Sequence, residues 1–153
     1  MESMSHRVDM SLSEQMHLHE LEISNRKALL EFGSDDIRNL KRVGVRLEDY
    51  LDGIVDKFYG KQLEVEEIAL IIGDSDTLFR LRAAQRCYVV DLFSGNYDLD
   101  YVNNRLRIGQ VHKRIGVEPK HYLSAIAVLK GVLSEHIRNV FSSPEDHTAI
   151  EHS

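Results

Sequence analysis

The sequence has little or none of several residue types: one cysteine, two prolines, no tryptophan and no long apolar run in 153 residues. With Cys87 alone, no disulfide forms within the chain, which fits a reducing cytoplasm. No stretch approaches the roughly 20 apolar residues that a membrane-spanning helix needs. Residues 1–10 lack the apolar core of an export signal. We therefore expect a cytoplasmic protein with no membrane partner.

Basic charge is also scarce. The chain has 19 Lys and Arg against 25 Asp and Glu, a formal net charge of −6. Nucleic-acid binding needs a basic face, so this balance argues against a nucleic-acid partner. The 42% of hydrophobic residues indicates a folded domain. A chain of this length buries enough surface to enclose a cofactor.

The apolar residues repeat with helical periods and rarely alternate, which predicts an all-α fold. We expect residues 1–10 to be a flexible N-terminal segment and 11–153 to form one domain. The expected helices are Leu12–Leu21; a piece capped by Ser24 and ended by Gly33; one capped by Ser34 that carries Ile37 to Leu47; one carrying Leu51 to Tyr59; one between Ser75 and Gly95; Leu99–Lys113; and Tyr122–Phe141. The two prolines, Pro119 and Pro144, fall at the expected helix boundaries. These periods fit a globin-type packing or another helical bundle.

His112 is the histidine whose position is most informative. It lies in LRIGQVHKRIGVEP near the end of an expected helix, on one face with Ile108 and Ile115. An imidazole on an apolar stripe is often a hydrogen-bonded core histidine. Alternatively, it is an axial ligand of haem iron, since a neutral imidazole binds iron and apolar walls keep a porphyrin dry.

Two tyrosines, like His112, each allow a structural and a functional interpretation. Tyr59 ends an apolar stripe and is either a core tyrosine with its hydroxyl at a wet edge or a hydrogen-bond donor to a bound gas. Tyr122 lies ten residues after His112 and either packs in the core or bonds the second imidazole nitrogen of His112.

Other catalytic or metal motifs are weak. There is no GxSxG, P-loop or GxGxxG motif, no CxxC pair, and no histidine pair with the i, i+4 spacing of a helical zinc site. Cys87 falls on a helical stripe, where we expect a small buried thiol rather than a nucleophile.

Residues 103–126, NNRLRIGQVHKRIGVEPKHYLSAI, resemble the proximal region of the bacterial globin-coupled sensors. The pattern RIGxVHxRIGVxPxxY carries the resemblance. The upstream stretch IRNLKRVGVRLEDYLDGIVDKFYGKQLE is similar to the early helices of that family. Together they cover roughly residues 20–142. The resemblance implies a globin-like helical sandwich enclosing haem b, with an extra N-terminal helix.

The same resemblance implies roles for particular residues. His112 matches the proximal haem ligand, and Tyr59 matches the distal tyrosine that bonds the gas. Tyr122 matches the tyrosine whose hydroxyl bonds back to the proximal histidine. The distal-wall positions are Leu81, Ala84 and Gln85. The expected ring contacts are Phe58 and Val55, with Ile108, Val111 and Ile115 beneath the ring.

The family joins such a sensor to an output domain, namely a diguanylate cyclase, a histidine kinase or a chemotaxis transducer. We expect no enzyme activity in the sensor domain itself. Family members dimerise through their last two helices. The resemblance therefore implies a homodimer through the C-terminal helices. About ten polar, His-rich residues follow Pro144, so we expect the last helix to be truncated or missing, which argues against the usual form of that dimer.

The predicted function is therefore a haem-based sensor of O2 that also binds CO and NO. One alternative is a haem enzyme that handles O2 or NO, although no distal histidine and no flavin or nicotinamide motif is evident. The other is a haem-free globin-like signalling module, against which the joint presence of His112, Tyr59 and Tyr122 argues.

Overall fold

The structure, a computed structural model, describes residues 10–142 and contains no strand among them. The predicted all-α class is confirmed. The elements are α1 (Leu12–Gln15), α2 (Glu20–Leu29), α3 (Ser34–Leu47), the 3₁₀ turn η1 (Glu48–Tyr50), α4 (Leu51–Leu63), α5 (Glu66–Ile72), α6 (Ser75–Leu92), α7 (Leu99–Arg114) and α8 (Pro119–Val140). No described helix is long and apolar enough to cross a membrane.

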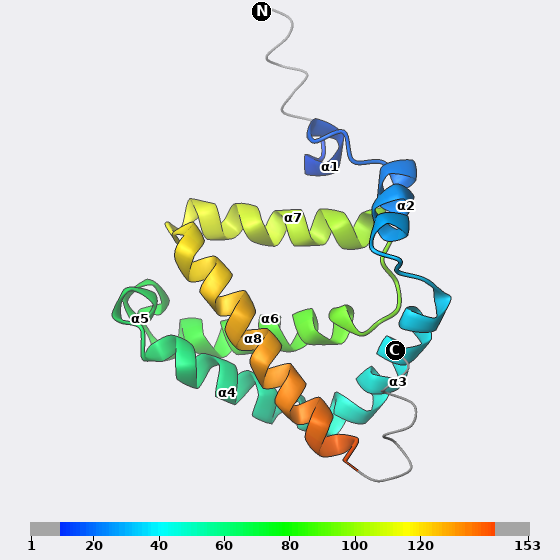
Figure 1. The fold of residues 1–153 in the computed structure, drawn as a ribbon. Coiled ribbons are helices and arrows are strands. Elements are labelled where there is room, and N and C mark those ends of the chain that lie inside the picture. The colour runs from blue at the N-terminus through cyan, green and yellow to red at the C-terminus, as the bar shows by residue number, and fades with distance from the viewer. Residues whose placement is uncertain (1–9, 143–153) are drawn as a thin grey trace, which may run out of the picture.

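Helix α4 lies at the centre of the domain, in contact with α5, α6 and α8. Its inward residues follow the helical period and are almost completely buried: Leu51, Ile54, Val55, Phe58 and Tyr59. Each such apolar side chain contributes roughly 1.5–3 kcal/mol by leaving water. Figure 1 shows α8 crossing α4 obliquely, and these two helices are in contact.

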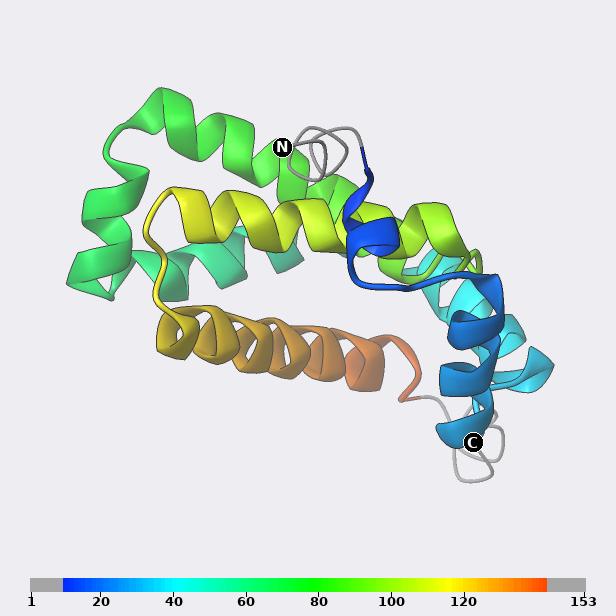
Figure 2. The same cartoon turned by 90° about the horizontal axis from the view of Figure 1, so that it is seen from above.

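One end of the molecule is formed by α5 and the turn between α7 and α8, and the opposite end by α2 and α3, as both views show (Figures 1 and 2). The first end is the end at which the candidate site lies. Two of the expected helices, Leu99–Lys113 and Tyr122–Phe141, are observed with small shifts as α7 and α8. Pro119 is the first residue of α8, where its missing N–H removes no helical hydrogen bond.

The N-terminal helices differ from the prediction. The expected helix Leu12–Leu21 ends at Gln15, and His17 takes a left-handed conformation with φ 56°. Helix α2 then begins at Glu20, so Ser24 lies inside it and caps nothing. The cap is His19, whose Nδ1 accepts a bond of 3.3 Å from the backbone N–H of Glu22. Histidine is not among the usual N-cap residues, so the pattern missed it.

Three other predicted boundaries are also shifted. Helix α2 ends at Leu29 rather than at Gly33. The caps of α3 and α6 are Gly33 and Asp74, one residue before the expected Ser34 and Ser75. Asp74 is the stronger cap because its carboxylate accepts a bond of 2.7 Å from the N–H of Thr77.

Cys87 is exposed, and the prediction of a buried thiol is wrong. The buried side of α6 is marked by Val89. Cys87 precedes Val89 by two residues, which turns it to the other side of the helix. Pro144 and the His-rich segment after it lie outside the described residues, as do residues 1–9, so the expectations about them stay predictions.

Gly44 in α3 packs closely against Phe93 at the end of α6. A Cβ at position 44 would lie 2.8 Å from the Phe93 Cβ and 3.3 Å from its carbonyl oxygen. We therefore expect Gly44→Ala to lower the free energy of unfolding by roughly 1–3 kcal/mol, as overpacking does. Urea denaturation measures this loss.

Gly53 in α4 provides the matched control, because a Cβ there meets nothing within 4 Å. We expect Gly53→Ala to leave the stability unchanged or to raise it by up to about 1 kcal/mol. Equal losses in the two variants would contradict the close approach of α3 to Phe93.

Candidate functional site

A cavity of about 210 Å³ lies among α4, α5, α6, α7 and α8. Most of its walls are aliphatic side chains and Phe58. The polar side chains that border it are Tyr59, Gln62, Gln85, Tyr88, His112, His121 and Tyr122. An apolar pocket with a few convergent polar groups is the usual form of a cofactor site.

His112 borders this cavity from the last turn of α7. Its Nδ1 lies 2.8 Å from the carbonyl oxygen of Ile108, one turn earlier. A carbonyl oxygen only accepts, so in the neutral imidazole Nδ1 carries the proton and Nε2 keeps its lone pair. Such a bond fixes the tautomer and the ring orientation of a metal-binding imidazole.

The end of α7 also fixes the backbone of His112. Gly116 has φ 84°, the left-handed conformation that glycine adopts without strain. The N–H of Val117 donates to the carbonyl of His112 at 3.0 Å, and the N–H of Gly116 to that of Lys113 at 3.2 Å. These two bonds form a Schellman motif, so the turn into α8 starts at His112 itself.

Tyr122 contacts His112 in a way that the resemblance did not predict. The two rings meet edge to face, with centroids 5.1 Å apart and an interplanar angle of 71°. The expected bond from the Tyr122 hydroxyl to Nδ1 is absent among the described residues, because the Ile108 carbonyl occupies that nitrogen. Tyr122 therefore supports His112 by ring packing.

Tyr59 borders the same cavity from α4 and is 9% exposed. Its hydroxyl donates to the carbonyl oxygen of Leu81 on α6 at 3.3 Å, and its ring packs edge to face on Phe58 at 5.0 Å. Burial raises the pKa of Tyr59 to about 12. The side chain is thus a neutral phenol, a hydrogen-bond donor, at physiological pH.

This raised pKa predicts a loss of stability at alkaline pH. The unfolded chain releases the phenol proton near pH 10, at a lower pH than the folded chain does. The contribution of Tyr59 burial to the free energy of unfolding is therefore fully present below about pH 10 and is lost as the pH rises toward 12. We expect wild type to lose more unfolding free energy than Tyr59→Phe between about pH 9 and pH 11. Urea denaturation at both values measures it, and equal losses would contradict the buried phenol.

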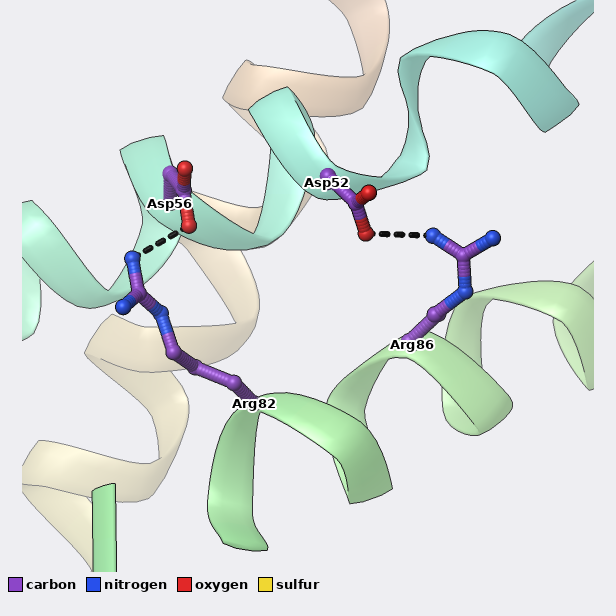
Figure 3. Close-up of polar contacts among 4 residues, drawn as sticks. All are labelled: Asp52, Asp56, Arg82 and Arg86. Atoms are coloured by element: carbon purple, nitrogen blue, oxygen red, sulfur yellow. Dashed lines mark hydrogen bonds and ion pairs between the residues drawn. The ribbon is translucent and has the colours of Figure 1, made fainter. Parts of the chain in front are cut away.

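The three predicted distal-wall residues, Leu81, Ala84 and Gln85, all border the cavity from α6. The face between α4 and α6 is closed on the outside by two ion pairs, Asp52 with Arg86 and Asp56 with Arg82 (Figure 3). Their side chains are partly exposed, so each pair contributes little stability. They join the helix of Tyr59 to that of Leu81.

The predicted ring contacts are brought together only in part. Phe58, Ile108 and Ile115 border the cavity. Val55 is buried but belongs to the core beside it, because it lies a turn before Tyr59 on α4. Val111 is 38% exposed and does not border the cavity, since it precedes His112 by one residue and points about 100° away.

Sequence reasoning missed several residues of this cavity. Gln62 and Tyr88 lie one turn after Tyr59 and Gln85, so the helical period is the signal that identifies them. His121 precedes Tyr122 at the start of α8, and only the short turn at Gly116 brings it to the same cavity as His112. Helix α5 contributes Ile68, Ile71 and Ile72, which no sequence pattern marked as site residues.

These side chains fit a porphyrin better than a bare metal ion. Among residues 10–142, no group of three or more His, Cys, Asp or Glu side chains is placed to hold a metal. One imidazole alone does not retain a metal ion, whereas haem brings four ring nitrogens and needs one axial ligand from the protein. The apolar walls and the Nε2 of His112, which has no hydrogen-bond partner among residues 10–142, fit that requirement.

The fold and the cavity are those of a globin domain. A model of the Protoglobin family matches residues 19–151, most of the chain. The chain belongs to the Protoglobin family, and the predicted globin-like fold and the resemblance to the globin-coupled sensors are confirmed.

A particular relative is the "Heme-based aerotactic transducer HemAT" of Halobacterium salinarum. It is 29% identical over 116 residues, which are 75% of this chain and 24% of that protein. The chain thus matches about a quarter of the length of this curated relative.

Proposed function

We propose that this domain binds haem b through His112 and senses a diatomic gas, with O2 as the physiological ligand and CO and NO as further ligands. The observation that carries the proposal is the imidazole of His112, with Nδ1 held by Ile108 and Nε2 free, beside an apolar cavity. Haem, when bound, supplies the iron that takes up the gas. Membership of the Protoglobin family and the similarity to a haem-based transducer support the assignment.

The side chains around the cavity have different proposed roles. His112 would hold the haem through its Nε2, and Tyr122 keeps the imidazole ring in place. The aliphatic walls exclude water, which strengthens every hydrogen bond in the cavity. Tyr59 would provide a neutral hydrogen-bond donor, which favours O2 over CO because O2 is the better hydrogen-bond acceptor.

The backbone offers a route for a signal from this site. The Schellman turn begins at the carbonyl of His112 and leads into α8 within a few residues. A displacement of His112 therefore moves the start of α8. Such a small displacement becomes a signal where the packing has two arrangements to choose between.

We further propose that α8 presents the homodimer surface and that the intact protein carries an output domain. Leu123 on α8 is 67% exposed, an apolar side chain that a partner helix would cover. The relative is a transducer of which the matched region is about a quarter, which supports an additional signalling region. A sensor, rather than an enzyme, is the role that we assign to residues 11–153.

A spectroscopic titration tests this function. Purified protein is titrated with haemin, reduced, and exposed to O2 and then to CO. We expect a one-to-one Soret band and reversible spectra of both gas complexes. Absence of haem binding would support the haem-free module instead. Sustained consumption of NO with a reductase would support the enzyme.

A further inference from the structure

Gln62 is a second polar side chain of α4, besides Tyr59, that borders the cavity. It is 6% exposed, which makes it one of two buried polar residues among the described ones. It lies three residues after Tyr59, so the two side chains share one side of the helix.

The amide of Gln62 has no hydrogen-bond partner among residues 10–142, in contrast to Tyr59, which donates to Leu81. It is also not one of the sealed, unpartnered side-chain groups, which belong to Arg82 and Arg105. Its nitrogen and oxygen thus stay accessible although the residue is buried. Gln62 borders the cavity, so an occupant of the cavity is in a position to provide that partner.

A buried amide without a partner costs stability. An aliphatic residue would fill the same position without that cost, as it does at Ile68 and Ile72 in the adjoining wall. The amide Nε2 donates two hydrogen bonds and Oε1 accepts. A small polar or polarised ligand in the cavity satisfies it, whereas a purely apolar occupant does not.

We propose that Gln62 is a second hydrogen-bond donor to the gas ligand and sets the preference for O2 over CO together with Tyr59. This inference rests on the proposed haem function. The resting partner of Tyr59, the Leu81 carbonyl, competes with the gas for its hydroxyl. Gln62 has no such competitor among the described residues, so its donor is free from the start.

The test uses haem-loaded protein and the variants Gln62→Met and Gln62→Leu, which remove the amide and keep an unbranched or similarly sized apolar side chain. We expect O2 release to become roughly three- to tenfold faster, the effect of losing one neutral hydrogen bond. The CO release rate should change less than twofold. The C–O stretching frequency of the CO complex should rise, because a donor near the gas lowers it.

Gln110→Met is the matched control. It is the same substitution at an exposed position of α7 that lies outside the cavity. Wild-type O2 release and an unshifted C–O frequency in both Gln62 variants would overturn the inference. If one of the two Gln62 variants does not fold, the release rates and the C–O frequency of the other variant test the inference. Failure of the haem function itself is recognised separately, because wild type would then show no Soret band.

Discussion

His112→Ala is expected to abolish tight haem binding. The imidazole is the one axial ligand that we assign, so its removal costs more than the roughly 10- to 100-fold that loss of a supporting partner of a metal ligand costs. Haemin titration followed at the Soret band measures the affinity. Circular dichroism checks that the helices persist, which we expect because His112 is only half-buried.

His121 provides the control for this experiment, since it is the other imidazole that borders the cavity. We expect His121→Ala to bind haem with nearly the wild-type affinity. If His112→Ala retains a histidine-ligated spectrum and the double variant loses it, the ligand is His121 and our assignment is wrong. A normal spectrum in both single variants and in the double variant would show that neither histidine binds the iron.

Tyr59→Phe is expected to have the largest effect on O2 release. The variant keeps the ring that packs on Phe58 and removes only the hydroxyl. Loss of one buried hydrogen-bond donor costs on the order of 1–3 kcal/mol. If the whole cost falls on the bound state, O2 release becomes roughly 5- to 150-fold faster. Stopped-flow measurement gives the rate, and CO release should change much less.

The matched control is Tyr50→Phe, the same change at a tyrosine that is 48% exposed and lies outside the cavity. We expect it to leave both release rates unchanged. Equal O2 release in wild type and Tyr59→Phe would mean that the hydroxyl stays on the Leu81 carbonyl when the gas binds. The role of donor would then pass to another residue.

The sequence predicted the helices whose ends carry strong local signals. Gly73 and Gly116 take left-handed conformations at the ends of α5 and α7, and Pro119 starts α8. The α1–α2 region was predicted poorly, because a left-handed His17 and a capping His19 are not favoured by local preference. Tertiary contacts decide such positions, as the bond from the Ser13 N–H to the Asn103 side chain of α7 illustrates.

The candidate site was predicted from the family resemblance, because residue type and helical period alone left a plain core role open for His112 and for Tyr59. His112, Tyr59 and the three α6 residues border one cavity, as the resemblance implied. The binding mode of Tyr122 was not predictable, because an acceptor within the same helix, the Ile108 carbonyl, takes the imidazole N–H first. Which of two neighbours on a buried face reaches the cavity, as Phe58 does and Val55 does not, depends on where α4 crosses its neighbours.

The proposed bond between the His112 imidazole and haem iron is tested most directly by resonance Raman spectroscopy of the ferrous, gas-free protein. We predict an iron–imidazole stretching band in wild type, its disappearance in His112→Gly, and its return when free imidazole is added to that variant. A band that persists unchanged in His112→Gly, or a wild-type protein that takes up no haem at all, would contradict the account.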